Sequence, residues 1–204
     1  MLAYHSTVLL MLAGSCCGAS LGWGEEAAYT IVESGEGWEV RRYPATTWLT
    51  TAPFQSVLPH SGPDREEALA RLTRYSQGAN MAGMEVKIAM PLVQKIFPGA
   101  TPATPSNSSL ALPLPLAMQH VIPPAPTETG LQLVVVPEHT VVTRQFSGQA
   151  GERDWAVELT TLFRLARNAG LVVTPVPQYT AEYSELETQL ARRNEVWLEV
   201  DINQ

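Results

Sequence analysis

The sequence predicts an α+β protein in which a mostly antiparallel sheet or barrel carries two packed helices. Strand-like segments with alternating polarity fill much of the chain, and two amphipathic helix patterns occupy residues 61–78 and 151–169. The same order of elements (hairpin, helix, strand, strand) also occurs twice. Because neither half alone would cover its sheet edges, we expect one domain built from two pseudo-twofold related halves rather than two domains.

The composition of the 204-residue chain is that of an ordinary globular protein. Hydrophobic residues make up 45% of it and charged residues 16%, so the chain can bury a sizeable core. The formal net charge of -7 argues against a nucleic-acid or anionic-membrane surface, because either would need a concentrated basic patch. The charge is compatible with a small anionic ligand held by one or two local arginines.

The first 22 residues resemble a secretory signal peptide. They contain no Lys, Arg, Asp or Glu, and the apolar run "TVLLMLAGSCCGA" ends in small residues, so we expect cleavage between residues 19 and 22. A membrane anchor is the alternative, although the run is shorter than the ~20 residues that span a bilayer. Cleavage would remove both Cys16 and Cys17 and leave a cysteine-free domain over residues 27–204, with no membrane attachment.

One sequence motif outside the leader also favours secretion. Asn107 begins the N-glycosylation sequon "NSS". The sequence therefore predicts a secreted, extracellular glycoprotein.

The first half predicts a hairpin, a helix and a strand. "YTIVES" and "WEVRRYPATTWL" read as two strands joined by the turn "GEG", the second of them bent at Pro44. Pro63 and acidic residues suit the start of the helix at 61–78, and Gly78 suits its end. Residues 84–90 alternate between apolar and other side chains, which predicts a strand with one buried face. On this reading Met84 and Met90 fill the core, and Met81 lies in a turn.

Residues 98–126 contain eight of the sixteen prolines. A central strand does not tolerate that proline density. We therefore predict an exposed loop, one strand near residues 114–122 and a Pro-rich connection.

The second half repeats the pattern. Residues 131–147 read as two strand segments bent at Pro137, and residues 151–169 form the clearest amphipathic helix in the chain. Strands are expected at 178–184 and 194–200. The apolar stripe of the helix consists of Trp155, Leu159, Leu162, Phe163 and Ala166.

The chain carries few signals for enzymatic or metal chemistry. Beyond the predicted leader the sequence has no G-x-S-x-G, no Gly-rich phosphate loop, and no H-E-x-x-H or C-x-x-C spacing, so we predict a non-enzymatic protein. The histidines are scattered at His5, His60, His120 and His139, and we assign none of them to a metal.

Arg71 and Arg74 are the candidate charged binding residues. They lie about one turn apart on the first helix and are either solvated surface arginines or cations positioned for the carboxylates of a ligand. Trp38, Trp48 and Trp197 lie in strand patterns and are expected in the core rather than in a stacking platform.

Four segments of the chain resemble the SOUL haem-binding protein family in order and spacing. They are "YTIVESGEGWEVRRYPATTWLTT", "LTRYSQGANMAGMEVKIAMPLVQ", "VIPPAPTETGLQLVVVPEHTVVTRQFSG" and "RRNEVWLEV", and the likeness extends from about Tyr29 to Val200. The resemblance implies a distorted antiparallel β-barrel with two packed helices. It also implies non-covalent binding of haem or a related tetrapyrrole in a shallow apolar cleft, between the first helix and the loop joining the last two strands.

The resemblance also assigns residues to this cleft. Arg74, with Arg71 nearby, would face a haem propionate, and no axial iron ligand is assigned. The apolar walls would be formed by Leu69, Leu72 and Thr73 on the helix and by Leu186 and Leu190 on the loop. The implied role is that of a carrier or scavenger. The alternative is a protein-interaction or signalling module on the same fold, with an unknown protein partner and little or no haem binding.

Overall fold

The computed structural model describes residues 23–101, 103–183 and 192–201. Two helices, α1 (Pro63–Ser76) and α2 (Glu152–Asn168), match the two predicted helices closely. The strands of the first half are β1 (Trp23–Glu26), β2 (Thr30–Gly35), β3 (Trp38–Tyr43), β4 (Thr46–Thr51), β5 (Phe54–Ser56), β6 (Ile88–Met90), β7 (Leu92–Phe97) and β8 (Ser106–Pro113). Those of the second half are β9 (Leu131–Val136), β10 (His139–Ser147), β11 (Val173–Glu182) and β12 (Arg193–Val200).

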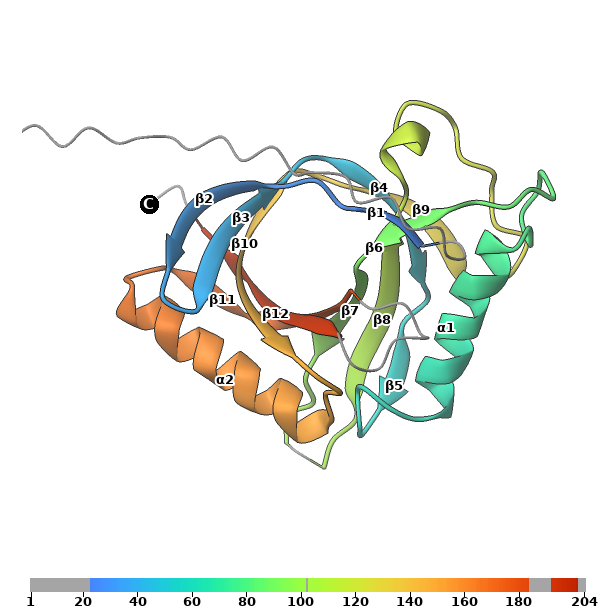
Figure 1. The fold of residues 1–204 in the computed structure, drawn as a ribbon. Coiled ribbons are helices and arrows are strands. Elements are labelled where there is room, and N and C mark those ends of the chain that lie inside the picture. Colours follow the sequence, from blue (N-terminus) through green and yellow to red (C-terminus); the bar gives the residue numbers. More distant parts are fainter. Residues whose placement is uncertain (1–22, 102, 184–191, 202–204) are drawn as a thin grey trace, which may run out of the picture.

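Ten strands form one strongly curved antiparallel sheet in the order β2-β3-β10-β12-β11-β7-β8-β4-β9, with β5 paired to β8 (Figure 1). β1 and β6 form a separate parallel pair. The α+β class with a mostly antiparallel sheet is therefore confirmed. Within the described ranges β2 and β9 lie at opposite ends of the strand order and do not pair, so the sheet is open and the predicted barrel is not confirmed.

The strand order reflects the two halves of the chain. Four strands of the first half each have a counterpart in the second: β3 corresponds to β9, β4 to β10, β7 to β11 and β8 to β12. When counterparts are exchanged, the strand order from β3 to β9 is the same order read from the other end. The pair β7–β11 forms the centre of this arrangement. β3 pairs with β10 and β9 pairs with β4, so each half completes the sheet of the other.

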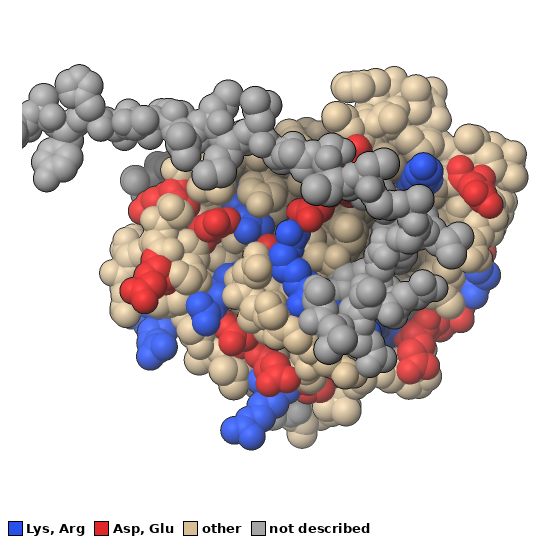
Figure 2. All heavy atoms as spheres, in the orientation of Figure 1, with Lys and Arg blue, Asp and Glu red and all other residues tan. Residues whose placement is uncertain are grey.

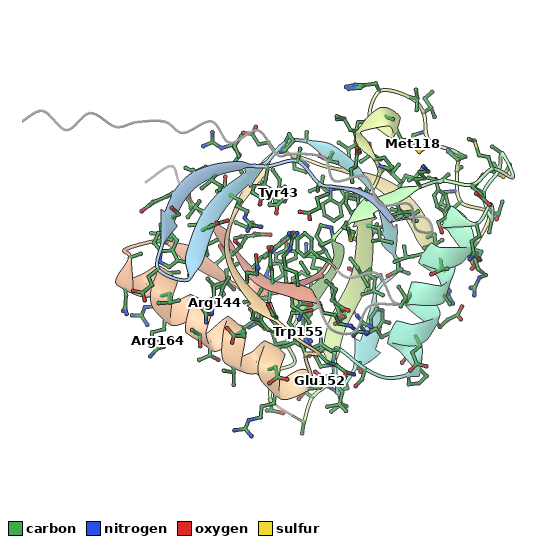
Figure 3. The ribbon with its side chains drawn as sticks, in the orientation of Figure 1. Tyr43, Met118, Arg144, Glu152, Trp155 and Arg164 are labelled. Carbon is green, nitrogen blue, oxygen red and sulfur yellow. The ribbon has the colours of Figure 1, made fainter. Side chains whose placement is uncertain are left out.

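Side chains on the curved sheet form three clusters, because successive strand residues point to opposite faces. Helix α1 covers one cluster on the outer face and α2 covers another (Figure 1). In β12, Val196 and Leu198 face α2, whereas Trp197 belongs to a third cluster with Tyr43 inside the curve (Figure 3). Trp48 belongs to this inner cluster too, and Trp38 packs against the α2 cluster, as expected for core tryptophans.

The expectation for residues 98–126 is partly wrong. β8 lies between β7 and β4, in the interior of the sheet, where an exposed loop was predicted. Pro105 precedes this strand and Pro113 is its last residue, while residues 106–112 contain no proline and can complete the hydrogen-bonded ladder. The strand predicted near residues 114–122 is also wrong, because this segment contains a short 3-10 helix, Leu116–Met118.

The strand predicted at residues 84–90 is reduced to β6, and Met84 is 50% exposed rather than buried. The buried amide of Asn80 explains the difference. Its Nδ2 donates to the carbonyl oxygens of Tyr75 (3.2 Å) and Met84 (2.7 Å), and its Oδ1 accepts from the backbone N–H groups of Ala82 and Met84. These bonds hold residues 80–84 in a turn, so the strand begins only at Ile88.

No helix in the described ranges is long and apolar enough to cross a lipid bilayer.

Candidate functional site

The residues expected on the helical wall of the ligand cleft lie on different sides of α1. Leu72 has no exposed surface and belongs to the core beneath the helix. Leu69 and Thr73 are half-buried on one flank. Arg71 lies roughly 160° around the helix axis from Thr73, because each residue advances the helix by about 100°. Arg74 lies between these flanks on the exposed side, and its side chain pairs with Glu67 on the Arg71 flank.

The flank that carries Leu69 and Thr73 continues through Arg65, one turn earlier. The guanidinium of Arg65 donates to Gln94 of β7 (3.0 Å) and pairs with Glu182 at the end of β11. This flank therefore lies beside the point where the connection between β11 and β12 begins. Residues 184–191 of that connection lie outside the described residues, and so do the two predicted loop contacts, Leu186 and Leu190.

Arg74 belongs to a cluster of four charged side chains. Its Nε lies 2.6 Å from Glu128 Oε1 and its Nη2 lies 2.8 Å from Glu128 Oε2, so the pairing is bidentate. Glu67 Oε1 accepts from both Arg74 Nη2 and Arg71 Nε at 3.0 Å. The hydrogen bonds that Arg74 donates to Glu128 and Glu67 raise the pKa of Arg74. Hydrogen bonds from Arg74 lower the pKa of Glu128, and hydrogen bonds from Arg71 and Arg74 lower the pKa of Glu67. The cluster contains two guanidinium and two carboxylate groups, so its formal charges cancel.

Because the charge of Arg74 is already balanced, its guanidinium is not free to pair with an anionic ligand. A ligand carboxylate has to replace Glu128 as the partner of the guanidinium. The Arg74 side chain is 43% exposed, so water screens the pair and the exchange is feasible. For the predicted cleft, the described residues offer the carbon surface of Leu69 and Thr73 and one guanidinium, groups that suit the apolar face and a propionate of haem.

The described residues contain no group of three or more His, Cys, Asp or Glu side chains that could hold a metal ion. The histidine nearest the start of α1, His60, is packed against α2. Its ring stacks on Trp155 with centroids 4.9 Å apart, and its buried Nδ1 has no partner within the described ranges. Burial, with a smaller contribution from Arg65, lowers the pKa of His60 to about 3.

Charged side chains also meet inside the curve of the sheet. Arg41, which is 4% exposed, donates from Nη1 to both carboxylate oxygens of Glu195 (3.1 and 2.9 Å). On the face shown in Figure 2, basic and acidic side chains are interspersed and form no separate basic region.

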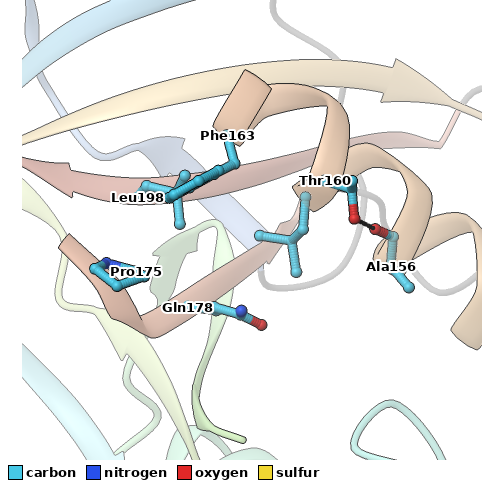
Figure 4. A pocket seen from close by; sticks show the side chains of 7 residues that line it. Ala156, Thr160, Phe163, Pro175, Gln178 and Leu198 are labelled. Carbon is cyan, nitrogen blue, oxygen red and sulfur yellow. Dashed lines mark hydrogen bonds between the residues drawn. The ribbon is translucent and has the colours of Figure 1, made fainter. Parts of the chain in front are cut away.

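A pocket of about 390 Å³ lies between α2 and the strands β11 and β12 (Figure 4). None of the predicted site residues lines it. Leu159 and Phe163 were predicted in the core-facing stripe of the helix, and the pocket that they line was not predicted. The segment "TPVPQ", with two prolines inside a predicted strand region, was the available signal.

Comparison with known proteins shows what the chain is similar to. Residues 24–199 match the family model described as SOUL heme-binding protein. Heme-binding protein 2 of Mus musculus is 31% identical over 79% of this chain and 77% of its own length. Heme-binding protein 2 of Homo sapiens is 29% identical over 87% of this chain and 90% of its own length.

A solved structure shares the fold at low sequence identity. The C-terminal domain of EcmrR superposes with a TM-score of 0.58 at 10% identity, covering 85% of this chain and 98% of that domain. This likeness concerns the fold alone. The family match over residues 24–199, together with the two relatives, decides the family: the chain belongs to the SOUL heme-binding protein family.

Proposed function

We propose that this protein binds haem or a related tetrapyrrole non-covalently, in a cleft between α1 and the connection from β11 to β12. The observation that carries the proposal is the family match over residues 24–199, supported by two relatives named as heme-binding proteins. Those relatives are named as binding proteins, which supports a binding rather than a catalytic role.

The geometry of α1 supports Leu69 and Thr73 as the helical wall. The opposite wall is assigned to Leu186 and Leu190 by the sequence resemblance alone, because both lie outside the described residues. Arg74 pairs with a propionate after leaving Glu128, whereas Arg71 stays with Glu67 on the other flank. Haem supplies a planar apolar surface with two carboxylates, which suits apolar burial combined with one arginine contact.

Titration of the purified domain with hemin tests the binding. We expect a saturable change in the Soret band together with quenching of tryptophan fluorescence at one hemin per chain. Absence of saturation would contradict the proposed function.

Two matched variants test the propionate contact separately. Arg74→Ala removes the cation, and we expect several-fold weaker hemin binding. Glu128→Gln frees the same guanidinium from its partner, and we expect tighter binding. Unchanged affinity in both variants would exclude the Arg74 contact and leave the apolar cleft in place.

We also propose that the protein is a secreted carrier or scavenger. Support comes from the uncharged apolar leader in residues 1–22 and from Asn107, the sequon residue, which is exposed on β8. Intact-mass measurement of protein recovered from culture medium should show loss of the leader and a further mass decrease after treatment with an N-glycosidase. A mass that includes residues 1–19 would contradict secretion with cleavage.

The pairing of Arg74 with Glu128 favours one alternative function. If this pair persists, the cleft has no cation available for a propionate, and the fold serves as a protein-interaction or signalling module. The absorption spectrum of protein isolated from its native source separates the two: a Soret band supports haem binding, and its absence favours the module.

A further inference from the structure

The pocket beside α2 results from an interruption in β11. In the pairing of β11 with β12, Thr174 is opposite Glu199 and Gln178 is opposite Leu198, so three extra residues are inserted between adjacent partners. The inserted residues are 175–177, Pro-Val-Pro. Proline has no backbone N–H to donate, so this part of the strand cannot continue the ladder. The strand bulges there, and Pro175 becomes one wall of the pocket.

The lining of the pocket combines apolar and polar surface. Its larger apolar side chains are Leu159 and Phe163 of α2 and the buried Leu198 of β12, and Pro175 of β11 adds to them. Phe163 and Leu198 lie next to each other in Figure 4. A volume of about 390 Å³ falls in the range of small-molecule sites, ~300–1,000 Å³. A ligand there would bury its apolar body against these side chains.

Two polar side chains complete the lining. The hydroxyl of Thr160 is occupied, because it donates to the carbonyl oxygen of Ala156 at 2.8 Å. The half-buried side-chain amide of Gln178 forms no hydrogen bond to any of the described residues. Gln178 can therefore offer a donor and an acceptor to a ligand.

A cation lies next to the pocket on the same helix. Ala156, Thr160, Phe163 and Arg167 follow one another at spacings of three or four residues and share one side of α2. The guanidinium carbon of Arg167 lies 6.0 Å from the centre of the Phe163 ring. Arg167 forms no ion pair within the described ranges, in contrast to Arg74, whose charge is balanced by two carboxylates.

From these contacts we propose that the α2 pocket binds an amphiphilic organic anion. Its narrow apolar body lies against Leu159, Phe163 and Leu198, its carboxylate or sulfonate pairs with Arg167, and the Gln178 amide forms one hydrogen bond. The site belongs to the second half of the chain and shares no residue with the haem cleft proposed on α1. The two sites therefore bind their ligands independently.

Two fluorescent probes with similar apolar bodies test the site. 1-Anilinonaphthalene-8-sulfonate is anionic, and N-phenyl-1-naphthylamine is its neutral counterpart. We expect saturable fluorescence enhancement of both probes by the parent protein. Ala156→Trp fills the pocket from an exposed helix position and should lower the affinity for both probes at least tenfold. Val157→Trp, at the adjacent exposed position outside the lining, is the matched control and should leave both affinities unchanged.

A third variant tests the charge preference. Arg167→Ala should lower the affinity for the anionic probe at least fivefold and leave the affinity for the neutral probe unchanged. Equal effects on both probes, or no effect on either, would overturn the assignment to an anion. Equal binding of the probes by Ala156→Trp and Val157→Trp would overturn the pocket itself. Thr160→Phe fills the pocket from a second exposed position and provides the same test if Ala156→Trp fails to fold.

Hemin titration of Ala156→Trp separates this inference from the haem proposal. Unchanged hemin affinity, together with weakened probe binding, supports two independent sites. If filling the pocket abolishes hemin binding as well, haem occupies the α2 pocket and the independence of the two sites is overturned.

Discussion

Arg41 and Glu195 form a buried ion pair inside the curve of the sheet. Glu195 has no exposed surface, and its Oε2 also accepts from the Tyr183 hydroxyl (2.9 Å) and the indole N–H of Trp197 (2.8 Å). Burial opposes the charge of Arg41, but the Glu195 carboxylate together with Tyr43 and Tyr29 outweighs it and raises the pKa of Arg41. The hydrogen bonds inside the pair replace those that both side chains would form with water.

We predict that Glu195→Gln destabilises the fold by about 3 kcal/mol, because Arg41 then keeps only Glu39 as a charged partner. The double variant Arg41→Met/Glu195→Gln should recover part of this loss, since no unpaired charge stays buried. Urea denaturation of the two single variants and the double variant measures the coupling. A coupling energy near zero would show that Arg41 and Glu195 do not stabilise each other in the folded protein.

His60 predicts a stability change on acidification. Its pKa is about 3 in the folded protein, below the ordinary value of 6.5, because burial and the nearby Arg65 disfavour the charged ring. Between these values the unfolded chain binds a proton that the folded protein excludes. The contribution of neutral His60 to the free energy of unfolding is therefore fully present above about pH 6.5 and is lost as the pH falls toward 3. The free energy of unfolding changes by at most ~1.4 kcal/mol per pH unit from this group.

His60→Phe keeps a ring against Trp155 and removes this titration. We expect its unfolding free energy, measured in urea between pH 7 and pH 4, to fall less steeply than that of the parent. Identical slopes in the two proteins would show that His60 does not titrate differently on folding.

At the scale of elements, the Asn80 turn joins α1 to β6. The Asn80 amide forms four hydrogen bonds, all to backbone groups of residues 75–84. We predict that Asn80→Ala costs about 2–3 kcal/mol, because buried backbone groups lose their partners. Asn80→Asp keeps the acceptor and loses the donors, so thermal unfolding should place it between the parent and the alanine variant. A melting temperature of Asn80→Ala equal to that of the parent would contradict this role.

The helices were predictable because their signals are local. Pro63, Gly78 and the apolar stripe of residues 151–169 bound helices that the structure places within two residues of the expected ends. β8 was missed because the prolines that flank it raised the proline density of the whole region. The turn predicted at Met81 extends to residue 84. This extension was missed because the alternation of Met84 and Val86 resembles a strand, whereas the hydrogen bonds of Asn80 keep the segment in a turn.

The candidate site was predictable to a similar degree. Helix geometry alone separates Arg71 from Thr73, so their placement on opposite flanks could have been anticipated from the sequence. The pairing of Arg74 with Glu128 could not, because it joins residues 54 positions apart across a Pro-rich connection. The α2 pocket also depends on the register between β11 and β12, which only the assembled sheet defines.

At the scale of the whole molecule, two topologically equivalent halves carry different surfaces. The exposed arginine of α1 is neutralised by acidic neighbours, whereas Arg167 of α2 stands beside an apolar pocket without an ion-pair partner among the described residues. One curved sheet supports both helices, because β3 and β9 each pair with the opposite half. We therefore propose one ligand site on each half, and we assign the one on α1 to haem.

The most direct test of that assignment is the position of bound hemin on the folded protein. Ferric haem broadens the amide signals of nearby residues in a ¹⁵N-resolved NMR spectrum, and a diamagnetic gallium protoporphyrin provides the control. We predict selective loss of the Leu69 and Thr73 signals on α1, with the Thr160 and Phe163 signals on α2 retained. Broadening confined to α2, or no selective broadening at one equivalent of hemin, would contradict a haem site on α1.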